Sequence, residues 1–354
     1  MYKRIIRFTA YTLAFTLCFL GLQRLFMPKY MSGVYEGALI GEYYGDNKQN
    51  QVIFIGDCEV YENFSPVTLW EEYGIASFIR GGPQQLIWQS YYLLEDTLRY
   101  ETPDVVVFNV LSMKYGAPQS EAYNRLNIDG MKLSMSKLGA AKASMAAGES
   151  LISYFLPILR YHDRWDDLSA DDIRFFFQTN RVSHNGYYMR CDVKPVDVIP
   201  VGQPLADYRF REICYEYLDK MAELCARNGI ELILIKAPAI YPYWYAQWDA
   251  QMVDYAQERG LLYLNLLDLA EEIGIDFATD TYDGGLHMNL SGAEKLSRYF
   301  GKILRDHCAL SDMRGDERLS EIWERKREAY YDMMRAQLRE IEEYGAVRTF
   351  TYAR

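Results

Sequence analysis

The chain has 354 residues, of which half are hydrophobic and a quarter are charged. This composition predicts a folded protein with room for one large domain or two modest ones, and it argues against disorder over most of the length. The net charge of −11 argues against a nucleic-acid partner, because phosphate recognition needs a surface rich in lysine and arginine.

The N-terminal segment is apolar and follows a cluster of positive charges. Residues 8–23 carry no charge, and apolar residues extend this run over 5–26. Such a run is near the lower length limit for a membrane-spanning helix. Three cations within residues 1–7 place the N-terminus in the cytoplasm by the positive-inside rule. A cleaved signal peptide is the alternative, but no small-x-small cleavage site follows the run. We therefore predict a single-pass anchor over residues 1–30, in contact with the membrane through residues 5–26, and an extracytoplasmic main domain.

Five of the six cysteines lie outside this anchor, and no two of the six form a C-x-x-C pair. Cys214 and Cys225 fall on one predicted helix, about 16 Å apart at the helical rise. They cannot pair with each other, because the Cα atoms of a disulfide lie within about 7 Å. An odd number of cysteines leaves at least one free or paired between chains. No His pair at metal-ligand spacing and no nucleotide-binding motif occurs, so we expect no metal and no other cofactor.

Apolar strand-like runs alternate with amphipathic helical segments along most of the chain. This alternation predicts a parallel α/β sheet with helices on both faces, a three-layer αβα, doubly wound architecture of the flavodoxin-like kind. We expect this domain over residues 31–310 and a charged helix over 311–354. The β-branched and apolar runs that predict buried parallel strands are residues 51–57, 75–80, 104–111, 231–238 and 261–267.

Helix-capping residues predict where two of the helices begin, and one long insertion interrupts the alternation of strands and helices. Ser65 and Pro66 predict the start of the helix that follows the first strand. A capping box at residues 291–294 predicts that a late helix starts at Ser291. Residues 112–205 interrupt the alternation with short helical pieces and an extended stretch. We expect this insertion to cover one end of the sheet and to be functional, as most loops of this length are.

Polar residues and glycines follow several predicted strands, where sites form in parallel sheets. The sequence F-I-G-D-C-E at residues 54–59 places Asp57 and Cys58 after the first strand. The sequence D-G-G-L-H-M-N at 283–289 places an aspartate and a histidine in a late loop. The other residues at predicted strand ends are Gly81, Gly82, Asn109 and Lys236.

A nucleophile after the first strand and a late Asp/His loop resemble the SGNH, or GDSL-like, hydrolase superfamily. The resemblance covers about residues 50–112 and 205–305. It is closest to membrane-anchored bacterial branches that handle cell-envelope polymers, such as alginate O-acetyltransferases and proteins of teichoic-acid D-alanylation. The family's G-D-S falls on Gly56-Asp57-Cys58, so that Cys58 stands where the family has its nucleophilic serine.

The resemblance also implies roles for the other strand-end residues. His287 would be the general base, and Asp283 would orient it from four residues before it, where the family has a spacing of three. Asp280 is a second candidate for that orienting role. The oxyanion would be bound by the N–H of Gly81 or Gly82 and by the side chain of Asn109. The remaining secondary candidates are Asp57 and Lys236. The alternative for Lys236 is a charged residue at a strand end with a structural role and no role as a base.

Two functions remain open on these residues. The first is an envelope esterase or O-acyltransferase acting on a carbohydrate or an acylated glycopolymer, together with a membrane-bound acyl-transfer partner. Cys58 beside a cationic imidazole would then be a thiolate near neutral pH. The second is a catalytically inactive SGNH-like binding or scaffold protein of cell-envelope polymer assembly, since a strand-end cysteine is also a common buried apolar residue. A sulfur close to the imidazole and open to a cleft would favour the enzyme.

Overall fold

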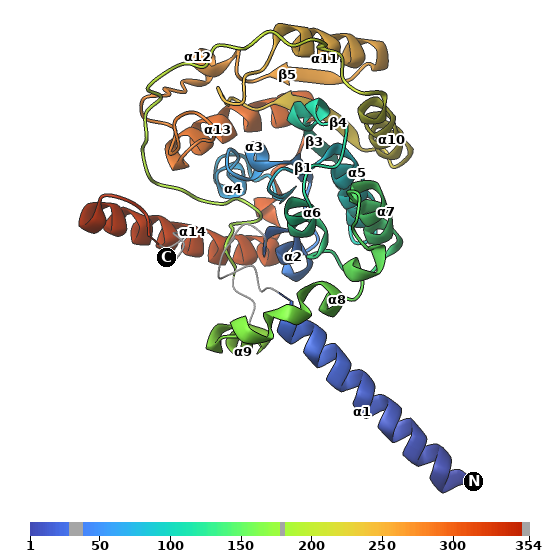
Figure 1. The fold of residues 1–354 in the computed structure, drawn as a ribbon. Helices are drawn as coiled ribbons and strands as arrows, with labels where there is room; N and C mark the ends of the chain where they lie inside the picture. The colour runs from blue at the N-terminus through green and yellow to red at the C-terminus, as the bar shows by residue number, and fades with distance from the viewer. Residues whose placement is uncertain (28–37, 178–180, 349–354) are drawn as a thin grey trace.

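A computed structural model describes residues 1–27, 38–177 and 181–348. Five strands form one sheet in the order β2-β1-β3-β4-β5, and every neighbouring pair is parallel. This is one of the two common orders of doubly wound sheets. The predicted parallel α/β sheet is therefore confirmed (Figure 1). The strands are β1 (Val52–Gly56), β2 (Ser77–Gly81), β3 (Val105–Asn109), β4 (Glu231–Lys236) and β5 (Leu262–Asn265).

Successive strand residues face two separate apolar layers, because side chains alternate across a sheet. Val52 and Phe54 of β1 belong to a core cluster shared with helices α4, α13 and α14. Ile53 and Ile55 belong to a second cluster shared with α5, α10 and α11. The helices of the two layers are α4 (Pro66–Tyr73), α13 (Leu290–His307), α14 (Glu317–Tyr344), α5 (Ile87–Thr97), α10 (Glu212–Arg227) and α11 (Ala246–Arg259).

The caps of two helices decide where they begin. Ser65 caps α4 as predicted, and its hydroxyl accepts a hydrogen bond from the N–H of Thr68 at 3.2 Å. Helix α13 begins earlier than predicted, because Asn289 is its N-cap and accepts from the N–H of Gly292 at 3.2 Å. The predicted capping box led by Ser291 is therefore wrong. Asparagine caps as well as serine does, and it comes first in the chain.

The charged C-terminal helix α14 packs against the sheet domain through a few apolar side chains. Trp323 is fully buried and stacks on Trp70 of α4, with ring centroids 5.0 Å apart and planes 8° apart. Tyr330 lies against the same layer, and its hydroxyl donates to Glu294 of α13 at 3.0 Å. Helix α14 therefore contributes to the core that supports the sheet.

The insertion contains several short helices followed by an extended segment. Its helix α7 packs against α5. The extended segment 183–196 starts beside β2, where the N–H of Ile79 donates to the carbonyl of Asn185 at 2.9 Å. Farther along, the N–H of Lys194 donates to the carbonyl of Thr281 at 2.9 Å. The remaining helices in the described part of the chain are α1 (Tyr2–Phe26), α2 (Leu39–Glu42), α3 (Cys58–Tyr61), α6 (Glu121–Ile128), α7 (Met135–Ser144), α8 (Ile158–Tyr161), α9 (Ala170–Phe177) and α12 (Ala270–Ile273). The same part has 3-10 turns at Tyr43–Gly45, Val110–Lys114, Leu151–Tyr154, His162–Asp167 and Met313–Gly315.

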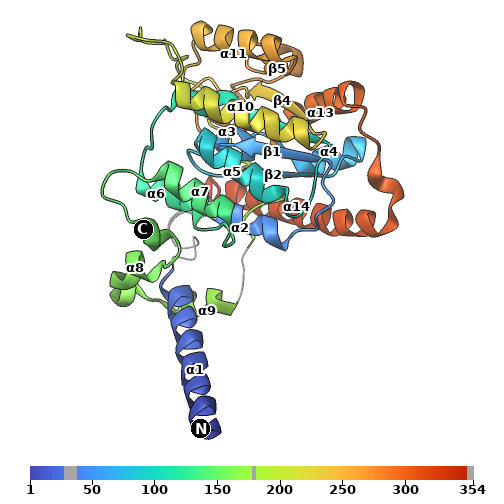
Figure 2. The ribbon, with the colours of Figure 1, turned by 90° about the vertical axis from the view of Figure 1, so that its right-hand side faces the viewer.

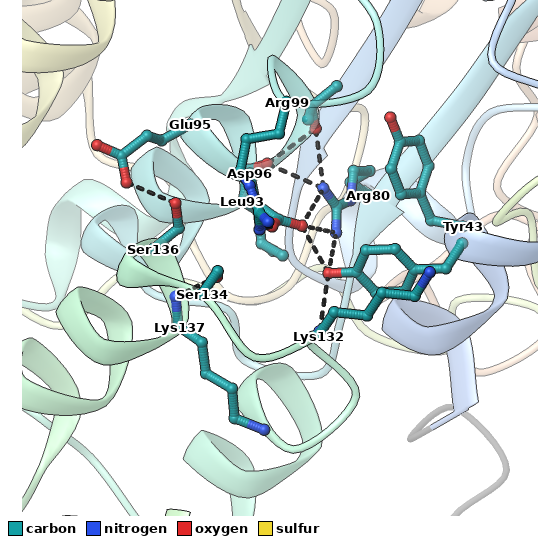
Figure 3. Close-up of polar contacts among 12 residues, drawn as sticks. Tyr43, Arg80, Leu93, Glu95, Asp96, Arg99, Lys132, Ser134, Ser136 and Lys137 are labelled. Carbon is teal, nitrogen blue, oxygen red and sulfur yellow. Dashed lines mark hydrogen bonds and ion pairs between the residues drawn. The ribbon is translucent and has the colours of Figure 1, made fainter. Parts of the chain in front are cut away.

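A buried ion pair secures the end of β2. The Arg80 guanidinium lies 3.2 Å from Asp96 of α5, and both side chains are fully excluded from solvent. The same guanidinium lies 4.0 Å from the ring centroid of Tyr43, which provides a cation–π contact (Figure 3). Arg80 immediately precedes Gly81, so this pair fixes the carboxyl end of β2.

Helix α1 projects away from the sheet domain (Figures 1 and 2). It has 25 residues and is long and apolar enough to cross a membrane, and none of its residues is buried within the protein.

Candidate active site

The carboxyl ends of four strands meet at one edge of the sheet. Gly56 at the end of β1 is paired with Gly81 of β2. Asn109 at the end of β3 is paired with Ile235 of β4, next to Lys236. The sheet therefore gathers on one edge the residues that the sequence places at separate strand ends.

Cys58 is the first residue of the short helix α3, directly after β1. Asp57 is the N-cap of that helix, and its carboxylate accepts from the N–H of Glu59 at 3.2 Å. The turn into α3 is tight, because a Cβ at Gly56 would lie 2.5 Å from a methyl group of Val60. Cys58 is partly exposed and packs against the core layer. Its backbone N–H belongs to the first turn, where helix N–H groups have no partner inside the helix.

His287 lies in the loop before α13 and is held by Asp283 through two contacts. The imidazole Nδ1 lies 2.7 Å from one carboxylate oxygen of Asp283. The backbone N–H of His287 donates to the other oxygen at 3.0 Å. Asp280 points elsewhere, since its carboxylate pairs with Lys295 at 2.7 Å. The structure thus brings Asp283 to the imidazole and leaves Asp280 as a support of the loop.

Cys58 and His287 lie together although they are far apart in the sequence. The two side chains are close enough that each shifts the pKa of the other. The Nε2 atom of His287 is buried and makes no hydrogen bond within the described part of the chain. Since Asp283 occupies Nδ1, Nε2 is the ring nitrogen left for the thiol or for a substrate. Hydrogen bonds between catalytic groups are often long before substrate binds.

Two neighbours of His287 were missed by the sequence reasoning. A carboxylate oxygen of Glu62 lies 3.6 Å from the His287 Nδ1, and this side chain is almost fully buried. Tyr282 donates its hydroxyl to Glu62 and stacks on the imidazole, with ring centroids 6.0 Å apart. Glu62 follows Cys58 by four residues and so lies one helical turn on. That spacing would have indicated it, had the helix α3 been predicted.

The pKa values of the pair are shifted in the same direction. Burial raises the pKa of the Cys58 thiol to about 11, although the nearby His287 acts to lower it. Burial alone would lower the pKa of His287, but the charge of Glu62, the neighbouring Cys58 and the hydrogen bond that the imidazole donates to Asp283 raise it well above its usual value. Burial therefore favours the neutral form of the Cys58 thiol, and the carboxylate of Glu62 favours the protonated form of the imidazole. The thiolate expected from the sequence is not the form that this environment favours.

A buried polar network lies under Cys58 and holds the remaining strand-end residues. The Asn109 amide donates to Asp57 at 3.2 Å and to Glu59 at 3.0 Å. Lys236 pairs with Glu59 at 2.9 Å, with both side chains almost completely buried. Burial, followed by the charge of Glu59, raises the pKa of Asp57 to about 6. Lys236 therefore has a structural partner, which the sequence reasoning missed because Glu59 stands inside the unpredicted helix.

Gly81 and Gly82 are both buried beside this edge. A Cβ at Gly81 would lie 3.0 Å from the carbonyl oxygen of Gly56, and one at Gly82 would lie 2.2 Å from the Asn127 side chain. A larger residue at position 82 would therefore have to displace the end of the Asn127 side chain.

A cavity of about 730 Å³ lies near the same edge of the sheet. Lys114, which follows β3, lines it, and the charges of Asp57 and Cys58 act on this lysine. Burial lowers the pKa of Lys114, and those two charges oppose the shift. Cys58, His287 and Asp283 are not among the residues that line this cavity, and Lys114 is the lining residue on which the charge of Asp57 acts. Its wall combines aromatic and charged side chains, including Tyr115, Phe210, Arg211 and Trp248.

No group of three His, Cys, Asp or Glu side chains within the described ranges is arranged to hold a metal ion. All six cysteines lie in those ranges, and each is free.

The sequence matches no family model and no curated protein. Among solved structures, the chain is similar to a Bacteroides fragilis protein described as a candidate acylhydrolase, with 14% sequence identity and a TM-score of 0.37. The similarity covers 74% of this chain and 90% of that one.

Proposed function

We propose that this protein is an SGNH-like enzyme that hydrolyses or transfers an acyl group carried as an ester. The proposal rests on the doubly held His287, with its Nε2 left without a partner next to Cys58. An acyl-transfer site needs a nucleophile, a base and a group that orients the base. Cys58, His287 and Asp283 supply these three in that order.

In the reaction that this arrangement supports, neutral His287 accepts the Cys58 proton at Nε2 as the sulfur attacks the ester carbonyl carbon. The tetrahedral oxyanion then collapses, the carbon–oxygen ester bond breaks, and the leaving alkoxide takes the proton from Nε2. A thioester on Cys58 remains. Water, or an acceptor hydroxyl, attacks this thioester while His287 again accepts and returns a proton. Asp283 keeps Nδ1 engaged throughout, so that Nε2 alone exchanges the proton.

Backbone N–H groups are the donors that we propose for the oxyanion. The N–H of Cys58 stands at the start of α3, and that of Gly81 or Gly82 follows on the adjacent strand end. Asn109 is the third candidate, although its amide already donates to Asp57 and Glu59. An oxyanion beside Cys58 would have to draw that amide away from one of these carboxylates.

We further propose a carbohydrate or acylated glycopolymer of the cell envelope as the substrate. The cavity that Lys114 lines supports this choice, because aromatic faces such as those of Tyr115 and Trp248 suit sugar rings and its charged groups suit polar substituents. Helix α1 supports a tethered protein with a cytoplasmic N-terminus and an extracytoplasmic domain, and a membrane-bound acyl-transfer partner could then supply the acyl group.

The test is to incubate the full chain with p-nitrophenyl acetate and measure both nitrophenolate release and the mass of the Cys58 peptide. We expect release, and a transient acetyl thioester on Cys58 that is absent from Cys58→Ala. Cys58→Ser restores the family's oxygen nucleophile and should retain part of the activity. Release that is unchanged in both Cys58→Ala and His287→Ala would overturn the assignment.

A binding or scaffold role is the second candidate, and the protonation state of Cys58 favours it. A thiol with its pKa raised to about 11 is weakly nucleophilic unless a base takes its proton. In a scaffold, Cys58→Ala would leave binding of acetylated glycopolymer unchanged, and no acyl thioester would form with any ester.

A further inference from the structure

Several large apolar side chains of the insertion are exposed close to the end of α1. Trp165 is 68% exposed, Ile173 is 61% exposed and Phe177 is 81% exposed. Leu159 of α8 is half-exposed. Exposed apolar residues gathered in one region usually mark an interaction surface. We call these four side chains the apolar platform.

The platform segments are bonded to the last turn of α1. The N–H of Ile158 donates to the side chain of Gln23 at 3.0 Å. Arg24 donates to the carbonyl of Phe176 at 2.7 Å, and Arg164 donates to the carbonyl of Phe26 at 2.6 Å. Figures 1 and 2 both show α8 and α9 at the C-terminal end of α1. The platform is therefore held at a fixed height relative to that helix.

The length of α1 determines how far the apolar platform lies from the centre of a bilayer that α1 spans. A hydrocarbon core of about 30 Å is spanned by about 20 helical residues. The apolar run begins at Ile5, so a spanning α1 reaches the far boundary of the core near Arg24. Ile158, Arg164 and Phe176, which are bonded to residues 23–26, then lie at the level of the lipid headgroups. Tryptophan and other aromatic side chains are enriched at that level.

We propose that the apolar platform of Leu159, Trp165, Ile173 and Phe177 docks on the leaflet from which α1 emerges, so that the domain rests on the membrane surface. This inference does not depend on the ester chemistry. Three exposed carboxylates beside Trp165 indicate which lipid is preferred, namely Asp163, Asp166 and Asp167. The neighbouring cations are paired, Arg164 with Asp172 at 3.1 Å and Arg160 with Glu121 at 3.0 Å. Acidic side chains are repelled by anionic headgroups. Docking should therefore rely on apolar contact and be stronger on phosphatidylcholine than on phosphatidylglycerol.

Intrinsic fluorescence provides the test, because Trp165 is the one exposed tryptophan among six and α1 contains none. The full chain is placed in phosphatidylcholine nanodiscs with acyl chains that are either plain or brominated near the glycerol end. The difference in emission between wild type and Trp165→Phe isolates the Trp165 signal. We expect bromination to remove most of this signal, and to remove less of it when phosphatidylglycerol is added.

Two variants separate docking from simple tethering. Ile173→Glu/Phe177→Glu changes exposed side chains only, so the domain should fold and α1 should keep it in the disc, but bromination should no longer quench Trp165. Gln257→Trp in the Trp165→Phe background places a tryptophan on α11, which lies at the opposite end of the domain from α1 (Figure 2), and it should not be quenched. A Trp165 signal unaffected by bromination, or quenching unchanged in the double variant, would overturn the proposal.

Discussion

Asp283 holds His287 with both oxygens of its carboxylate, one on the imidazole Nδ1 at 2.7 Å and one on the backbone N–H at 3.0 Å. A single carboxylate thus fixes the position of the loop and the orientation of the ring. This relationship shows how an aspartate four residues before the histidine reaches both the imidazole ring and the backbone. The aspartate bonds to the backbone of the residue that it orients, so its distance along the chain is set by this local turn.

Replacing Asp283 by asparagine should lower the rate of ester cleavage by about 10²–10⁴-fold, the usual worth of a well-placed general base. The amide can still accept from the backbone N–H, but it no longer fixes the imidazole with the proton on Nδ1. Steady-state cleavage of an aryl ester measures the loss. Asp306→Asn, which alters an exposed carboxylate at the end of α13, is the matched control and should leave the rate unchanged. A wild-type rate in Asp283→Asn would remove Asp283 from the mechanism.

Under the proposed function, Glu62 should set the pH at which ester cleavage begins. The imidazole must be neutral to accept the Cys58 proton, and Glu62 and Asp283 together with Cys58 raise its pKa well above the usual value. Activity should therefore rise as the pH increases above neutrality. Glu62→Gln removes one negative charge, so the rising limb of the kcat/KM profile should move to lower pH.

Tyr282→Phe is the companion variant, because it removes only the hydroxyl that donates to Glu62. The freed carboxylate is a better partner for the imidazolium, so the rising limb should move slightly to higher pH. Identical profiles for wild type and Glu62→Gln would show that Glu62 does not act on the base.

Alkylation of Cys58 should be slow at neutral pH and should accelerate toward pH 11. The folded pKa is raised, so the neutral thiol persists below that value and the reactive thiolate appears only as the pH passes it. Iodoacetamide labelling, followed by mass spectrometry of the Cys58 peptide, measures the profile against free cysteine. His287→Ala removes a group that lowers this pKa, so its profile should shift to still higher pH. Labelling faster than that of free cysteine at pH 7 would instead show a preformed thiolate.

The sequence predicts the sheet well and the site in part. Runs of β-branched and other apolar residues identify all five strands, because strands of a parallel sheet are buried on both faces and are therefore almost continuously apolar. Sequence motifs identified Cys58, Asp283 and His287, because each of them lies within a motif. Helix α3 could not be predicted, because its four residues are too few to show the spacing of apolar residues that marks a helix. Because helix α3 was not predicted, Glu59 and Glu62 were missed as well. Glu59 pairs with Lys236, and Glu62 lies beside His287. Asn109 was placed at the correct strand end, but its hydrogen bonds depend on that same helix.

The buried pair of Glu59 and Lys236 should be the most sensitive point of the fold beneath the site. Both side chains are almost completely excluded from solvent, with the Lys236 ammonium 2.9 Å from Glu59. Glu59→Gln leaves the ammonium without a charged partner, and removing one member of a buried pair costs about 3–5 kcal/mol. Glu59→Gln/Lys236→Met removes both charges and should recover most of that loss. Arg298→Met breaks an exposed pair with Glu72 and should cost at most about 1 kcal/mol. Urea unfolding followed by circular dichroism measures all three. A loss in Glu59→Gln no larger than in Arg298→Met would mean that water reaches Lys236, and that the network under Cys58 is open rather than closed.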